Sequence, residues 1–138
     1  MIKSMDNFKT VPGYLVDSNV IIGVITRDPN CVNFILENQN IVVPSIVVVE
    51  VLNGAETEEV RKEFEHIFST KPSLDLTAEL ALYAGKFLNE HRLLGRPCKN
   101  IDGILVATCF QYNFILVSKD KRLLNFATYA GVRTVDLN

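Results

Sequence analysis

The stretch "GYLVDSNVII", Gly13–Ile22, decides the fold of this chain. A turn signal, Pro12-Gly13, precedes the apolar residues Tyr14–Val16, which predict a short buried strand. Asp17 follows this strand directly, and two small polar residues come after it. An unpaired carboxylate in apolar surroundings is costly. We therefore expect Asp17 to meet a positive charge, a metal ion or hydrogen-bond donors in the folded protein.

Working outward from this stretch, short apolar runs alternate with segments of helical periodicity. Further strands are expected at Ile41–Val43, Leu74–Leu76, Ile115–Val117 and Val132–Val135. Helices are expected at Asn19–Thr26, Pro29–Glu37, Ser45–Asn53, Glu56–Phe68, Thr77–Leu94, Asp102–Tyr112 and Lys121–Ala130. This alternation indicates a single α/β domain with a parallel sheet covered on both faces.

The segment "SIVVVEVLNG", residues 45–54, has conflicting signals. Its four valines favour a strand. Ser45 is a residue type preferred at a helix N-cap, and Asn53-Gly54 is a typical helix stop. The sequence therefore predicts a buried helix beginning at Ser45.

The composition restricts the class of protein. The 138 residues suit one domain, and no apolar run approaches the length of roughly 20 residues that spans a membrane. The start of the chain lacks the apolar stretch of a signal peptide, so a cytoplasmic protein with unpaired thiols is expected. A net charge of −2 and a pI of about 5.7 are unusual for a nucleic-acid binder, although a local basic rim would suffice.

Four acidic residues need an explanation. In a parallel α/β sheet, ligands bind beyond the carboxyl ends of the strands, where Asp17 and Asp120 are expected to emerge. Asp102 lies at an expected helix start, and Glu50 is embedded in the most apolar stretch. Each has a simpler explanation alone: Asp102 as a cap, Asp120 as a turn residue, and Glu50 in a pair with a lysine. For Asp17 only a role in a turn is available, and the following Ser18-Asn19 could fill that role. Gathered in one crevice, four carboxylates repel one another, and an all-oxygen ligand set suits Mg²⁺ or Mn²⁺.

Four segments together resemble the signatures of a PIN domain, with most likeness to VapC-type toxin ribonucleases. The segments are "YLVDSNVII", "VPSIVVVEVLNGA", "IDGILVATC" and "LVSKDKRLLNF". The resemblance runs from Tyr14 to Val135. It implies a PIN-like nuclease domain over residues 14–138, preceded by an N-terminal extension over residues 1–13.

The resemblance implies a short parallel sheet of strand order 3-2-1-4-5, flanked by helices. It also implies a Mg²⁺- or Mn²⁺-dependent endoribonuclease, the toxin of a toxin–antitoxin pair, with an antitoxin partner and a homodimeric state. The family's catalytic and metal-ligating carboxylates fall on Asp17, Glu50, Asp102 and Asp120, of which Asp120 occupies the most variable position. Its supporting polar residues fall on Ser18, Asn19 and Ser118.

Several alternatives remain open on the sequence alone. Six basic residues near Asp102 and Asp120 are either ordinary surface charge or a rim that holds phosphates: Arg92, Arg96, Lys99, Lys119, Lys121 and Arg122. His66 and His91 are expected on solvated helix faces. The main rival function is a non-catalytic RNA-binding or scaffold module on the same fold. A phosphatase with an aspartyl nucleophile is disfavoured by Asn19, and a signalling receiver by the lack of an acidic pair before Tyr14.

Overall fold

A computed structural model describes residues 13–138, so the expected N-terminal extension lies, apart from Gly13, outside the described residues. These residues contain a five-stranded parallel sheet of order β3-β2-β1-β4-β5, as predicted. The strands are β1 Tyr14–Val16, β2 Ile41–Pro44, β3 Ser73–Leu74, β4 Ile115–Ser118 and β5 Thr134–Asp136. The helices are α1 Ser18–Ile25, α2 Pro29–Glu37, α3 Ser45–Asn53, α4 Glu58–Thr70, α5 Ala78–Leu93, α6 Asn100–Tyr112 and α7 Lys121–Tyr129.

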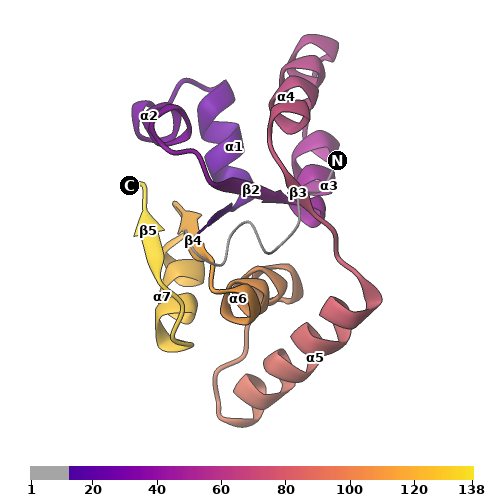
Figure 1. The fold of residues 1–138 in the computed structure, drawn as a ribbon, viewed down its shortest axis with the longest axis vertical. Coiled ribbons are helices and arrows are strands. Elements are labelled where there is room, and N and C mark those ends of the chain that lie inside the picture. The colour runs from indigo at the N-terminus through magenta and orange to yellow at the C-terminus, as the bar shows by residue number, and fades with distance from the viewer. Residues whose placement is uncertain (1–12) are drawn as a thin grey trace.

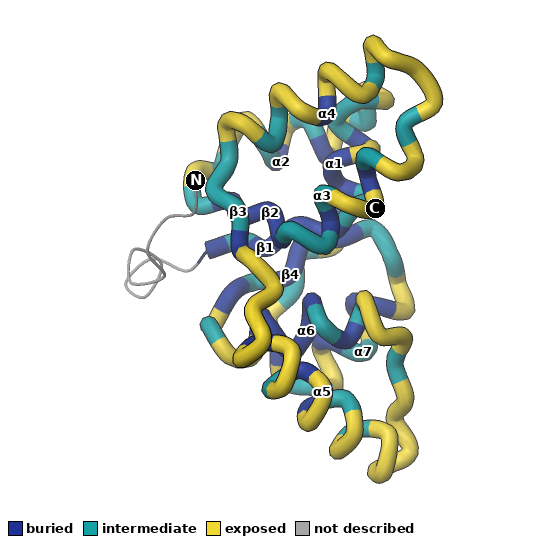
Figure 2. Tube along the Cα trace, turned by 90° about the vertical axis from the view of Figure 1, so that its right-hand side faces the viewer, coloured by how far each residue is buried: buried dark blue, intermediate teal, exposed yellow. Residues whose placement is uncertain are grey.

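The sheet lies between two helical layers (Figure 1). Helices α1–α4 cover one face, and α5–α7 cover the other. The central strand β1 pairs with β2 on one side and β4 on the other, so that Leu15 lies between Val42 and Leu116. All three side chains are buried, and the buried residues concentrate along the central strands and α6 (Figure 2). Packing against both faces explains why these strands are continuously apolar.

The run of valines after β2 forms the predicted helix α3. Val47 and Val51 are buried, whereas Val49 and Glu50 are exposed, which is a period of four and not of two. Burial of one helical face therefore overrides the β-propensity of valine. The same geometry turns Glu50 outward, away from the core.

The predicted N-cap of α3 is wrong. Pro44 occupies the N-cap position without a side-chain hydrogen bond. The Ser45 hydroxyl instead accepts a hydrogen bond from the backbone N–H of Leu76 at 3.2 Å. Proline ends β2 because it offers no N–H for the ladder, and its fixed φ suits the residue before a helix. Ser45 is thereby free to hold the segment that leaves β3.

Helix α6 packs closely on α5 near its beginning. A Cβ atom added at Gly103 would overlap the side chain of Leu88. Glycine therefore allows the first turns of α6 to approach α5. This packing places the start of α6, which begins at Asn100 and not at the predicted Asp102, beside the end of the sheet.

The remaining differences are local. Helix α4 begins and ends two residues later than expected, and β3 and β5 are shifted by one or two residues. His66 is exposed, as expected, but the prediction for His91 is wrong. The His91 ring is half-buried 4.3 Å from the Phe87 ring, and its Nδ1 lies 2.8 Å from the Phe87 carbonyl oxygen. No helix within residues 13–138 is long and apolar enough to cross a bilayer.

Candidate metal centre

The four acidic side chains singled out in the sequence come together at the carboxyl ends of the strands. Asp17 follows β1, Asp120 lies two residues beyond β4, Glu50 lies in α3 after β2, and Asp102 lies in the first turn of α6. All four line one open hollow of about 570 Å³. Its other lining residues are Ser18, Asn19, Lys99, Asn100 and Ile101.

Asp17 is the most buried of the four, with only 6% of its surface exposed. One carboxylate oxygen accepts a hydrogen bond from the backbone N–H of Ser18 at 2.7 Å, which makes Asp17 the N-cap of α1. The other accepts one from the hydroxyl of Ser118 at 2.9 Å. Burial raises the pKa of Asp17 above its ordinary value, although these two donors oppose the rise. The carboxylate is thus fixed in position and held at an electrostatic cost.

Ser118, which is fully buried, connects Asp17 to the other polar residues of the site. Its hydroxyl oxygen accepts hydrogen bonds from the side-chain amide of Asn19 at 3.3 Å and from the backbone N–H of Asp120 at 2.9 Å. Asn19 in turn accepts a hydrogen bond from the backbone N–H of Lys119 at 3.1 Å. These contacts join the start of α1 to the loop after β4. Ser118 and Asn19 thus form a hydrogen-bonded group beside Asp17.

Asp120 has a structural task, although it is a helix cap and not only the turn residue of the simpler explanation. Its Oδ1 accepts hydrogen bonds from the backbone N–H groups of Arg122 and Leu123, at 3.0 and 3.3 Å. It is therefore the N-cap of α7. Its carboxylate also lines the hollow, and its charge raises the pKa of Asp17 and Asp102. The capping role and a ligand role are compatible because a carboxylate has two oxygens.

Within the described part of the chain, Asp102 and Glu50 have no comparable structural task. The N-cap of α6 is Lys99, and no side-chain hydrogen bond caps that helix, so Asp102 is not its cap. Glu50 forms no ion pair with a lysine of the described chain. The pKa of each is raised, first by burial and then by neighbouring carboxylates: Asp17 and Asp120 act on Asp102, and Asp17 and Asp102 act on Glu50. The four side chains therefore repel one another across the hollow.

The hollow fits a hydrated hard cation better than a closed metal cage. Its donors are carboxylate, hydroxyl and amide oxygens, and no histidine or cysteine lines it. Within residues 13–138, no group of three or more acidic, histidine or cysteine side chains is gathered closely enough to hold an ion by itself. Mg²⁺ commonly keeps several waters and uses one or two protein carboxylates, which the width of this hollow permits.

Three of the six side chains of the predicted basic rim contact partners elsewhere in the structure. Lys119 pairs with Asp28, and Lys121 pairs with Asp136 at 2.7 Å. The Arg96 guanidinium lies 4.2 Å from the centre of the Tyr129 ring. Lys99, by contrast, lines the hollow itself. Closeness in sequence to an acidic residue therefore does not reveal which basic side chain reaches the hollow.

Two features of the site were not predicted. Asn100 and Ile101 line the hollow, and their position in the same helical turn as Asp102 was the available signal. Cys98 lies close enough for Asp102 and Asp120 to add to the effect of burial, which raises its pKa to about 11. At neutral pH this thiol is protonated, so it is no activated nucleophile. Cys31, Cys98 and Cys109 are all free, as expected.

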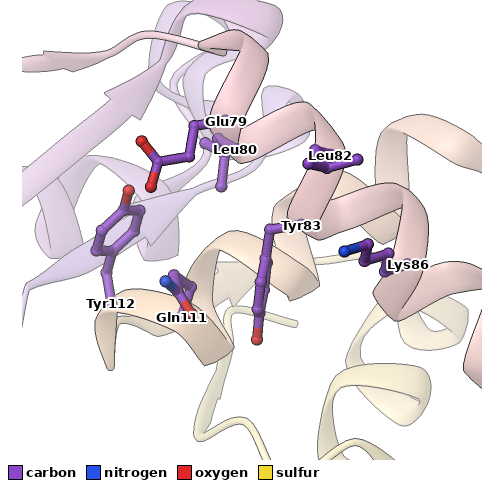
Figure 3. Close-up of a pocket in the computed structure, with 7 residues that line it drawn as sticks. All are labelled: Glu79, Leu80, Leu82, Tyr83, Lys86, Gln111 and Tyr112. Atoms are coloured by element: carbon purple, nitrogen blue, oxygen red, sulfur yellow. The ribbon is translucent and has the colours of Figure 1, made fainter.

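Another hollow, of about 230 Å³, lies between α5 and α6 (Figure 3). Glu79 and Tyr112 lie at one end and Lys86 at the other. Among residues 13–138, Glu79 is the only carboxylate that lines it, and none of the predicted site residues does. This hollow lacks the paired acidic groups that metal-assisted phosphoryl chemistry needs, whereas the hollow at the carboxyl ends of the strands contains them.

Solved structures share this fold. A chain of a DNA-bound VapBC structure from Salmonella typhimurium matches with a TM-score of 0.75 and 19% identity, over 93% of this chain and 100% of that one. A chain of a toxin–antitoxin complex from Klebsiella pneumoniae matches with a TM-score of 0.73 and 17% identity, over 91% of this chain and 98% of that one. A chain of VapBC2 from Rickettsia felis, bound to a promoter DNA fragment, matches with a TM-score of 0.72 and 20% identity, over 89% of this chain and 97% of that one.

Comparison of the sequence itself gives a more specific result. No curated protein matches it significantly. The family model of the PIN domain matches residues 14–129, a span that begins with β1 and includes all four carboxylates of the hollow. The match covers most of the chain, and the sheet order agrees with the resemblance seen in the sequence. The chain therefore belongs to the PIN domain family.

Proposed function

We propose that this chain is an endoribonuclease that uses Mg²⁺ or Mn²⁺ to hydrolyse phosphodiester bonds in RNA. PIN domains are generally nucleases. The observation that supports the finer assignment is the convergence of four carboxylates, from four separate elements, on one hollow. Asp17, Glu50, Asp102 and Asp120 are the proposed ligands, with Ser18, Asn19 and Ser118 in support.

The residues divide the work according to their contacts. Asp17 is held by two hydrogen bonds and is the fixed point of the site. Asp102 makes no capping bond, so both of its oxygens are available, and Glu50 is exposed and able to orient a water molecule. The raised pKa of Glu50 makes its carboxylate a better proton acceptor. A bound divalent cation would supply neutralisation of the phosphodiester charge and activation of water.

We further propose that the protein is the toxin of a toxin–antitoxin pair that acts in the cytoplasm, where free thiols stay reduced. Similar folds occur in complexes described as toxin–antitoxin or VapBC. An apolar hollow of about 350 Å³ lies beside the acidic one, and Glu50 lines both. Its apolar lining comes from α1, α3 and α4 and includes Ile22, Ile25, Val51, Val60 and Phe64. An apolar helix of an antitoxin would be accommodated there.

A homodimer is also proposed. Leu36 on α2 and Val49 on α3 are 78% and 68% exposed, although both lie in segments rich in apolar residues. Exposed large apolar side chains in such numbers support an interaction surface. Light scattering on the purified chain tests this part. A strictly monomeric mass at high concentration would contradict the homodimer.

Cleavage of total RNA tests the nuclease proposal. Purified protein should cleave RNA with Mn²⁺ or Mg²⁺ and stop when EDTA is added. Cleavage that continues undiminished in excess chelator would contradict the metal mechanism. RNA binding with no cleavage, over a range of RNAs and both ions, would instead favour the non-catalytic scaffold on the same fold.

A further inference from the structure

The acidic hollow presents an electrostatic problem for the substrate class proposed above. Each RNA phosphodiester carries a negative charge, and four carboxylates line the hollow that it must enter. A metal ion would neutralise part of this repulsion, but flanking phosphates also approach the same rim. A fixed positive side chain at the hollow would therefore favour substrate binding.

Lys99 is the side chain in that position. Among the lysine and arginine residues within 13–138, it alone lines the hollow. Its backbone is fixed as the N-cap of α6, where its carbonyl accepts a hydrogen bond from Gly103 at 2.8 Å. Its side chain is exposed and forms no ion pair with any carboxylate of the described chain. The backbone of Lys99 is therefore anchored beside the hollow, and its ammonium has no ion-pair partner among residues 13–138.

Three of the other basic residues near the site are engaged elsewhere. Lys119 is paired with Asp28, and Lys121 is paired with Asp136. Arg96 is placed over the ring of Tyr129. Lys99 is also near enough to Asp102, three residues along the same turn, for its charge to lower the pKa of that carboxyl against the stronger effect of burial. It thus acts on the hollow at short range.

We propose that Lys99 is a substrate-positioning residue that binds a phosphate of the RNA beside the carboxylates. This assignment rests on the proposed endoribonuclease function. The competing explanation is that Lys99 only offsets the acidic charge of the hollow in the free protein. The two explanations differ in one measurable quantity, which is the number of counterions released when RNA binds.

The test compares two lysine variants in an Asp17→Asn parent, chosen so that RNA stays intact during binding. Lys99→Gln removes the proposed contact. Lys121→Gln removes a charge of equal sign that lies outside the hollow, on a side chain that is 68% exposed. A short fluorescein-labelled single-stranded RNA of mixed sequence is titrated with each protein over a series of salt concentrations. Fluorescence anisotropy gives the affinity and its salt dependence.

Lys99→Gln should weaken binding by about two- to five-fold at low salt, the scale of one exposed charge contact. It should also reduce the slope of log affinity against log salt by about 0.7, the value for one phosphate on a single strand. Lys99→Arg should restore the slope, and Lys121→Gln should leave it unchanged. In the chain with Asp17 intact, Lys99→Gln should raise KM more than it lowers kcat.

Two results would overturn the proposal, and they are distinguishable. If the parent binds RNA but Lys99→Gln has the slope and affinity of Lys121→Gln, the role of Lys99 is wrong and the nuclease proposal is unaffected. If neither the parent nor the unsubstituted chain binds or cleaves RNA, the proposed function fails and the role of Lys99 fails with it.

Discussion

The hydroxyl of Ser118 donates a hydrogen bond to Oδ2 of Asp17 at 2.9 Å and so connects two residues that are 101 positions apart in the chain. The same oxygen accepts hydrogen bonds from Asn19 and from the backbone of Asp120. A serine hydroxyl offers one donor and two acceptor sites. All three are in use, in a side chain that is fully buried.

Replacing Ser118 with alanine should therefore destabilise the fold and disturb the site together. Asp17 loses a donor, and two donors lose their acceptor, which costs on the order of 1–3 kcal/mol. Urea unfolding measures the loss, and Ser69→Ala is the matched control. Ser69 is exposed, and its hydroxyl bonds only the carbonyl of His66, so a change within about 0.5 kcal/mol is expected there. Equal effects in the two variants would contradict the proposed importance of the network.

Asp102→Asn should raise the melting temperature of the metal-free protein. The substitution removes a charge that Asp17 and Asp120 repel, and Asp102 does not cap its helix. Relief on the order of 1 kcal/mol would raise the melting temperature by a few degrees. Mn²⁺ should stabilise the unsubstituted chain, because the ion binds the folded site, and should stabilise the variant less.

The control for this comparison is Asp75→Asn, because Asp75 is exposed and lies outside the hollow. Asp17→Asn should raise the melting temperature less than Asp102→Asn does. Asp17 also accepts two hydrogen bonds that an amide cannot fully replace. A lower melting temperature for Asp102→Asn in EDTA, with no response of the unsubstituted chain to Mn²⁺, would show that Asp102 is structural.

The gain in stability that Asp102→Asn gives the metal-free protein should depend on pH. The pKa of Asp102 is raised above 3.8 in the folded protein, so the folded state binds protons more tightly than the unfolded state. The destabilisation of the folded state by the Asp102 charge is complete above the raised pKa. It declines as pH falls through that pKa and disappears below 3.8. The difference in urea midpoint between the two proteins in EDTA should therefore be large at neutral pH and small near pH 4. A difference that does not change with pH would exclude charge repulsion as its origin.

Cleavage should depend unequally on the four carboxylates. Asp17→Asn and Asp102→Asn should each abolish RNA cleavage and leave the circular dichroism spectrum unchanged. Asp120→Asn should be milder, because one oxygen of Asp120 already caps α7, and asparagine is an equally good N-cap. A fully active Asp17→Asn protein would remove the basis of the metal-centre proposal.

The two glycines on the facing helices α5 and α6 should respond in opposite directions to alanine. Gly103→Ala should cost about 1–3 kcal/mol, because its new methyl group meets Leu88. Gly85→Ala should stabilise by about 0.5–1 kcal/mol, because Gly85 is exposed within α5 and has open space around it. Thermal unfolding of both variants measures this. If Gly103→Ala is as stable as Gly85→Ala, the close approach of the two helices is not needed.

The positions of most strands and helices could be predicted because each element carries its own local signal, whereas the strand order followed from the resemblance to a PIN domain. Asp28-Pro29 starts α2, and Asp28 accepts a hydrogen bond from the backbone N–H of Asn30. The site was predictable to the extent that Asp17 and Asp120 follow strands. Contacts set by tertiary packing were not predictable: Ser45 bonds Leu76 and does not cap its helix, and the ring of His91 packs on Phe126 of α7. The partners of Lys119 and Lys121 were hidden for the same reason.

The bond between Asp17 and Ser118 also sets an order of events during synthesis. A chain emerging from the ribosome exposes Asp17 and Glu50 first, long before Ser118 and Asp120 follow. Until then β1 lacks its neighbour β4, and the buried carboxylate lacks the hydroxyl that holds it. An incomplete nascent chain therefore has no assembled acidic hollow. Whatever chemistry the hollow performs therefore requires that the chain has been translated at least through Asp120.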